Sequence, residues 1–173
     1  MQLGILRNLP NADKVVETVT EAIAKARASN IPVIYVTLTF RPGFPEINLN
    51  NKGFVGFQQR MAQVPLDTFA QIHPAISPRE NEIVVHKKRV SAFTGSDLEV
   101  VLRSLGINHL VLTGVATGGV VLSTLREAAD KDYAATVLAD ACGDADEEVH
   151  RVLTTKVFLR QAAVVSASEW APQ

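Results

Sequence analysis

The sequence has 173 residues, the size of one compact domain, and 47% of them are apolar, so we expect a single domain over residues 1–173 with its own core. Lys and Arg number 17 against 18 Asp and Glu, a net charge of -1 without a long run of either sign. This balance argues against nucleic acid or a membrane surface as a partner. No apolar stretch approaches the roughly 20 residues that cross a bilayer, and the first residues lack the layout of a signal peptide, so we expect a cytoplasmic protein.

Helical and strand-like segments alternate along most of the chain. Asn11 can cap a helix that ends near Ser29-Asn30. Residues 31–40 form a β-branched and aromatic run without polar alternation, which is typical of a strand buried on both faces of a parallel sheet. The later expected elements are strands at 83–87, 109–115, 134–139 and 162–167, a helix that Ser96 opens with a capping box and that closes at Gly106, and helices near 119–131 and 146–158.

This alternation predicts an α/β protein, a three-layer α/β/α sandwich with a doubly wound, mostly parallel sheet. A doubly wound domain normally begins with a strand that becomes central, but this chain opens on about ten residues and then a helix. Two alternatives follow. Either residues 2–6 form a stub of strand, or the first strand is missing or shortened in this sequence.

Residues 41–80 interrupt the alternation with many Pro and Gly residues and at most a short helix around 57–63. Phe44, Phe54 and Phe57 lie in this excursion. We expect these rings either to roof a site or to pack on a neighbouring subunit.

The turn Thr113–Val120, with three glycines, leaves a strand and enters a helix, where backbone N–H groups and the helix dipole favour negative charge. It lacks the Gly-Lys-Ser/Thr of a P-loop and the glycine spacing of a dinucleotide site. It is therefore either an anion or oxyanion hole or a tight turn that needs glycine for backbone reasons.

A second candidate is Lys87, at the end of the strand 83–87. Its ammonium either stabilises an anion in the crevice at the carboxyl ends of the strands or belongs to a solvated basic edge. Cys142, the single cysteine, is either a thiolate favoured by a helix start or a small buried hydrophobe. The four histidines have no ligand-spaced partner, so we expect no catalytic metal and no cofactor.

Three segments together resemble the isochorismatase-like hydrolases, also called the cysteine hydrolase family. They are Lys87-x-Arg-x-Ser-Ala-Phe93, then Leu112-Thr-Gly-Val-Ala-Thr117 followed by Ser123-Thr124, and then Tyr133 leading to Asp140-Ala141. The resemblance runs from about residue 12 to the end. It implies the fold already expected, and a family triad of Asp, Lys and Cys in which the thiolate attacks an amide and forms an acyl-enzyme.

Carried onto this sequence, the resemblance places the catalytic lysine at Lys87 and the nucleophile at Val120. It places a cis peptide at Val115-Ala116 and substrate contacts, including the oxyanion donors, on Val115, Ala116, Thr117, Gly118, Gly119 and Phe93. The family's acid would lie just upstream of Met1, because Met1-Gln2 align with the end of the Ile-Asp-x-Gln motif that closes the family's first strand.

Valine has no lone pair with which to attack, so the covalent amidase mechanism cannot run as written. Two hypotheses remain open. The first is a hydrolase of a small carboxylated or amide-bearing metabolite that works without the usual cysteine, as the family's isochorismatases do. The second is a catalytically inactive member that binds a ligand or forms oligomers. The resemblance also implies a homodimer or homotetramer.

Overall fold

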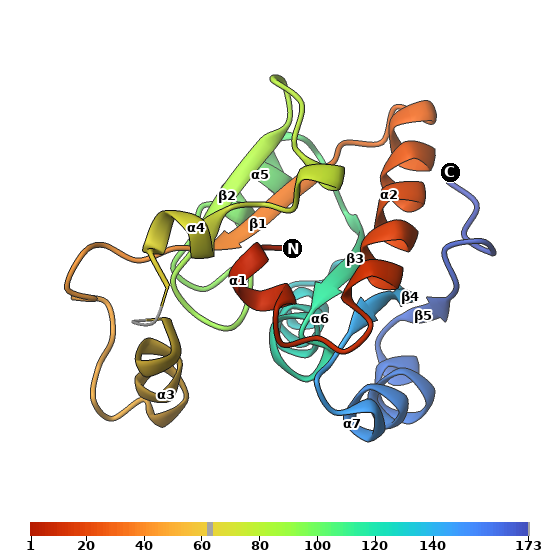
Figure 1. Cartoon of the computed structure of the whole chain (residues 1–173). Coiled ribbons are helices and arrows are strands. Elements are labelled where there is room, and N and C mark those ends of the chain that lie inside the picture. Colours follow the sequence, from red (N-terminus) through yellow and green to blue (C-terminus); the bar gives the residue numbers. More distant parts are fainter. Residues whose placement is uncertain (62–63, 173) are drawn as a thin grey trace.

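The computed structural model describes residues 1–61 and 64–172. Its strands are β1 (Ile34–Leu38), β2 (Ile83–Lys87), β3 (His109–Val115), β4 (Ala134–Gly143) and β5 (Ala163–Val165), and all their pairings are parallel. The α-helices are α1 (Leu3–Leu6), α2 (Ala12–Ala28), α3 (Lys52–Met61), α4 (Leu66–Ala70), α5 (Leu98–Ser104), α6 (Leu122–Asp130) and α7 (Glu147–Val152). This is the expected α/β class (Figure 1). No helix in the described ranges is both long and apolar enough to span a bilayer.

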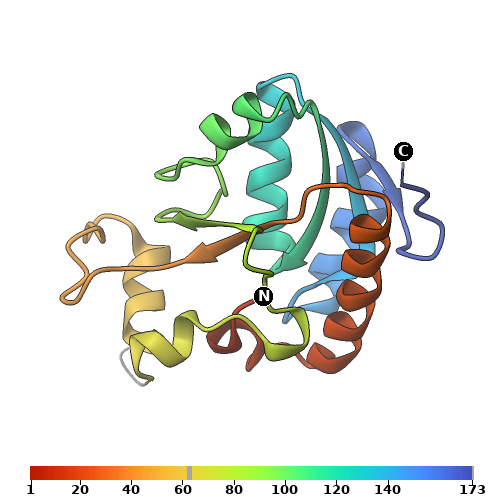
Figure 2. The ribbon, with the colours of Figure 1, turned by 90° about the horizontal axis from the view of Figure 1, so that it is seen from above.

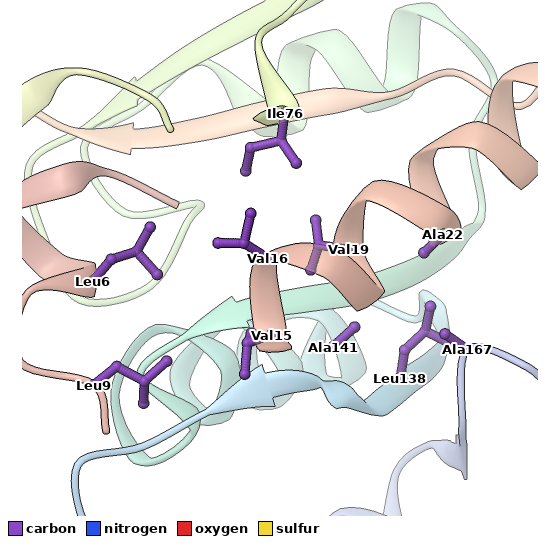
Figure 3. Packing of buried hydrophobic residues seen from close by; sticks show 10 residues of the cluster. All are labelled: Leu6, Leu9, Val15, Val16, Val19, Ala22, Ile76, Leu138, Ala141 and Ala167. Carbon is purple, nitrogen blue, oxygen red and sulfur yellow. The ribbon is translucent and has the colours of Figure 1, made fainter. Parts of the chain in front are cut away.

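Helices cover both faces of the parallel strands, which gives the three-layer α/β/α arrangement (Figure 2). On one face, α2 packs on β4 through a cluster that includes Val15, Val19, Leu138 and Ala141, drawn in Figure 3. On the other face, Leu125 of α6 packs against further β4 residues and the fully buried Phe158. Because β4 is covered on both sides, it reads in sequence as a nearly continuous apolar run.

The strands fall into two sheets, in the order β2-β1 and β3-β4-β5. In a doubly wound sheet of order 3-2-1-4-5-6, the first strand would separate these two groups. Within the described residues, no strand occupies that place. The chain start lies there instead, between β1 and β3 (Figures 1 and 2).

The alternative in which residues 2–6 form a stub of strand is wrong. Residues Leu3–Leu6 form helix α1, and only Gln2 makes an isolated bridge, to Ile72. Gly4 allows α1 to pack closely on α4, because a Cβ at this position would lie 2.0 Å from the ring of Phe69. The apolar residues of α1 are therefore buried by packing of this helix on α4 instead of by pairing of a strand.

The excursion between β1 and β2 contains α3 and α4, and a chain of aromatic contacts joins it to the end of β1. Ring centroids lie 6.0 Å apart for Phe40–Phe44, 5.8 Å for Phe40–Phe54, 6.3 Å for Phe54–Phe57 and 5.4 Å for Phe57–Phe69. The short helix expected at 57–63 lies within the longer α3 as far as Met61, and residues 62–63 fall outside the described residues. The rings thus pack within this chain, at the carboxyl end of β1.

Several element boundaries differ from the expected ones for physical reasons. β4 continues to Gly143 instead of residue 139, because its pairing with β3 resumes after an irregularity near Gly114. The helix expected over 119–131 begins as a π-helical turn, Thr117–Val121, before α6. The capping box expected at Ser96 does not form: the N-cap residue is Asp97, without a side-chain cap hydrogen bond, and Ser96 Oγ accepts from Leu98 N at 3.2 Å. Glu99 binds Lys131 instead, at 2.6 Å.

Candidate functional site

Lys87 is the last residue of β2, and its side chain is 6% exposed. Its ammonium donates to two carbonyl oxygens of the following loop, Arg89 O at 2.5 Å and Val90 O at 3.0 Å. Burial lowers the pKa of Lys87 to about 8. No carboxylate of the described residues forms an ion pair with it. Lys87 is therefore a buried cation whose proton is more readily released than that of an ordinary lysine, and the solvated-edge interpretation does not fit it.

The glycine-rich turn follows the end of β3. The Val115–Ala116 peptide bond is cis, at the position that the resemblance indicates. Ala116 O accepts from the N–H groups of Gly119 at 3.1 Å and Val121 at 3.3 Å. The turn thus enters the helix through a wide, π-helical first turn instead of a regular α-helical one.

One expected oxyanion donor is already occupied. Gly118 N donates to Asp144 Oδ2 at 2.7 Å, from the loop after β4. A Cβ on residue 118 would lie 2.9 Å from Val149 Cγ1 and 3.2 Å from Asp144 Oδ2, so the close approach of α7 requires glycine here. The turn does bind an anionic group, as expected of its N–H groups, but that group belongs to the protein itself.

A second polar contact ties the same turn to α7. Thr117 is fully buried, and its hydroxyl lies 2.8 Å from His150 Nδ1. Asp146 caps α7 by accepting from the N–H groups of Glu148 at 2.9 Å and Val149 at 3.2 Å. Asp144 and His150 together therefore fix the glycine turn against the start of α7.

The Lys87 loop and the glycine turn lie beside each other. Ala92 N, five residues after Lys87, donates to Thr124 Oγ1 at 2.9 Å in a buried hydrogen bond. Thr124 lies in α6, one helical turn beyond Val120. Thr94 Oγ1 also donates to Glu127 of the same helix, at 3.0 Å. The two segments that the sequence singled out thus meet at one side of the molecule, not on opposite rims of the sheet.

Three other expected positions have apolar surroundings. Val120 is half-buried and packs against the cluster around Leu125 and Phe158. Phe93 is 6% exposed and lies in the core, with its ring 5.8 Å from that of Tyr133, so its surroundings do not support a substrate contact. Cys142 is 3% exposed inside β4, and burial raises the pKa of its thiol to about 12. Cys142 is therefore a small hydrophobe.

Sequence reasoning missed Asp144 and His150 as residues that shape this site, and it included Thr124 only as part of the family resemblance. His150 gave no signal because it has no partner at ligand spacing in the sequence, whereas Asp144 follows a strand end, where ligand-facing residues of parallel sheets gather. Across the described ranges, no three His, Cys, Asp or Glu side chains form a group suited to a metal ion.

A three-layer α/β/α protein with a buried lysine and a glycine turn after the carboxyl ends of two of its parallel strands is typical of enzymes and binding proteins for small molecules. The model of the isochorismatase domain matches residues 1–169. The chain belongs to this family.

Individual relatives agree with this assignment. The chain is 34% identical to the ureidoacrylate amidohydrolase RutB of Pseudomonas syringae pv. syringae, over 87% of this chain and 62% of that protein. It is 31% identical to the N-carbamoylsarcosine amidase of an Arthrobacter species, over 78% of this chain and 52% of that protein. The chain thus spans between half and two thirds of the length of these two relatives.

A solved structure of an isochorismatase family protein from Burkholderia thailandensis superposes with a TM-score of 0.84. It is 31% identical in sequence, and the match covers 96% of this chain and 87% of that one. The shared fold therefore extends over nearly the whole described chain.

Proposed function

We propose that this chain hydrolyses a small amide-bearing or carboxylated metabolite at the carboxyl ends of β2 and β3. The observation that carries the proposal is the buried hydrogen bond from Ala92 N to Thr124 Oγ1, because it joins the Lys87 loop to the helix behind the glycine turn. The names of the two curated relatives, an amidohydrolase and an amidase, support an amide as the bond that is cleaved.

Lys87 is the charged group of the proposed site. Because burial brings its pKa to about 8, it can release or accept a proton not far above neutral pH. In its protonated form it stabilises negative charge that develops on a substrate carbonyl or on a leaving group. Its two carbonyl acceptors, Arg89 O and Val90 O, hold the ammonium in place.

The remaining contacts come from the backbone of Val115, Ala116 and Thr117, because the Gly118 N–H donates to Asp144 and the Gly119 N–H donates to Ala116 O. Val120 supplies no nucleophile, so the attack on the carbonyl falls to water and no acyl-enzyme forms. The acid that the resemblance assigns to the reaction is not among the described partners of Lys87.

A second candidate function is ligand binding without turnover. The observation that favours it is the half-buried, apolar Val120 at the position where the resemblance places the nucleophile. In this case the same residues hold the metabolite, but no bond is broken.

An assay of isochorismate and a panel of simple amides distinguishes the two functions. We expect turnover by the wild-type chain, a loss of at least about 100-fold on Lys87→Ala, and no change on Lys156→Ala, which removes an exposed lysine far from the site in sequence. Circular dichroism would check that each variant is folded. A folded wild-type chain that binds a metabolite and turns over none would contradict hydrolysis and establish the binding function.

A further inference from the structure

A groove of about 540 Å³ opens directly beyond the end of β2. One wall is the excursion loop at Pro45–Asn48, and the other wall contains Lys88, Arg89, Thr94 and Gly95 from the loop after β2. Lys88 follows Lys87 in the chain, and Lys87 Nζ donates a hydrogen bond to Arg89 O. The groove therefore adjoins the proposed site through a shared loop.

The groove carries two cations that no internal carboxylate neutralises. Lys88 Nζ donates to Thr39 O at 2.7 Å and to Thr39 Oγ1 at 2.9 Å, both uncharged acceptors. Arg89 donates to Lys88 O at 2.7 Å, and its guanidinium carbon lies 5.8 Å from the centre of the Phe54 ring. Within residues 1–61 and 64–172, neither side chain forms an ion pair.

The acid of the groove is engaged elsewhere. Glu46 accepts from Arg41 Nη1 at 2.7 Å, so its charge is already compensated. Lys88 and Arg89 are both only partly exposed, which distinguishes them from the freely solvated cations of a basic edge. The groove thus has a net positive charge with donor groups left over, because Arg89 has five N–H donors and uses one of them in the described contacts.

We infer that this groove is a subsite for a carboxylate, in which Lys88 and Arg89 bind the anionic end of a small substrate. A planar guanidinium binds a carboxylate through two parallel hydrogen bonds, and the neighbouring ammonium adds a second charge. The inference rests on the proposed function for the role of the bound molecule as substrate. It names the substrate class: an anionic metabolite whose carboxylate is separate from the bond that is cleaved.

Titration with succinate, and with its neutral isostere succinamide, tests the subsite without requiring turnover. We expect succinate to shift the amide NMR resonances of Lys88, Arg89 and Gly95, and succinamide to leave them unchanged. Arg89→Gln and Lys88→Gln should each weaken succinate binding by about tenfold, as expected for loss of a charge-assisted hydrogen bond. Arg89→Lys should retain part of the affinity, and Lys156→Gln should retain all of it.

Thermal unfolding of each variant would show that it is folded, because Arg89→Gln also removes the contact with Phe54. Equal affinity for succinate and succinamide, or an affinity unchanged in both charge variants, would overturn the subsite. The Lys87→Met variant separates the two proposals: it should lose any hydrolysis but still bind succinate. Succinate binding by a chain without hydrolytic activity would leave the subsite standing and remove only the proposed reaction.

Discussion

The side-chain amide of Gln2 pairs with the backbone of Leu38 as a neighbouring strand would. Gln2 Oε1 accepts from Leu38 N at 2.7 Å, and Gln2 Nε2 donates to Leu38 O at 2.9 Å. Thr39 N bonds to Lys87 O of β2, and since successive residues of a strand point to alternate sides, the Leu38 groups point away from β2. One buried side chain therefore satisfies both backbone groups of Leu38 on the edge of β1 that faces away from β2.

Replacing Gln2 by alanine should destabilise the protein by about 2 kcal/mol, because two buried backbone groups of Leu38 lose their partners. The measurement is the free energy of unfolding in urea. Gln71→Ala, at an exposed glutamine, is the matched control and should change it by less than about 0.5 kcal/mol. Equal effects of the two substitutions would show that the Gln2 amide does not hold this edge.

Alanine substitutions at the adjacent glycines Gly118 and Gly119 should have different effects on the stability of the protein. Gly118→Ala places its Cβ 2.9 Å from Val149 Cγ1 and should destabilise the protein by about 1–3 kcal/mol. Gly119→Ala meets only Ala116 Cβ, at 3.7 Å, and should be neutral or stabilise by up to about 1 kcal/mol through its helix propensity. Thermal unfolding of the two variants checks both signs. A destabilised Gly119→Ala with a tolerated Gly118→Ala would contradict the packing of α7 on the turn.

The sequence predicted the strands at 83–87 and 109–115 with their observed bounds, because each is a short β-branched run with a clear turn after it. It could not predict that β4 extends to Gly143, since that depends on a pairing irregularity in β3. Lys87 and the glycine turn were found as residues at strand ends. Asp144 was not, because its bond to Gly118 N joins residues 26 apart whose approach only the packed α7 defines.

Lys87 should make stability depend on pH in the alkaline range. Its pKa is about 8 in the folded chain and 10.5 when unperturbed, so between these values the unfolded chain binds more protons. The free energy of unfolding should therefore rise with pH from about 8 to about 10.5, relative to Lys87→Met. The rise should be at most about 3 kcal/mol, because the two carbonyl acceptors oppose the effect of burial.

Below pH 8 Lys87 is protonated in both states, so the difference between the two proteins should be flat there, as it should be above about 10.5. Urea unfolding of both proteins across this range is the measurement. Parallel curves throughout would show that the Lys87 ammonium is not buried as described.

Cys142 should not react with iodoacetamide in the native protein at pH 8. With a thiol pKa of about 12, its thiolate fraction at that pH is roughly one in ten thousand. Mass spectrometry should show an unmodified chain after hours under native conditions and full alkylation within minutes in denaturant. Rapid native alkylation would mean that β4 opens readily at this point.

The proposed function requires that Lys87 and residue 120 share one site, and a thiol introduced at residue 120 measures this directly. Because Cys142 is buried and its thiol pKa is raised to about 12, the rate of iodoacetamide alkylation against pH should report the pKa of the new thiol in Val120→Cys. The same measurement on Val120→Cys combined with Lys87→Met removes the cation. We predict that the thiol pKa is lower by about one unit when Lys87 is present. Identical pH profiles in the two variants would contradict a shared site.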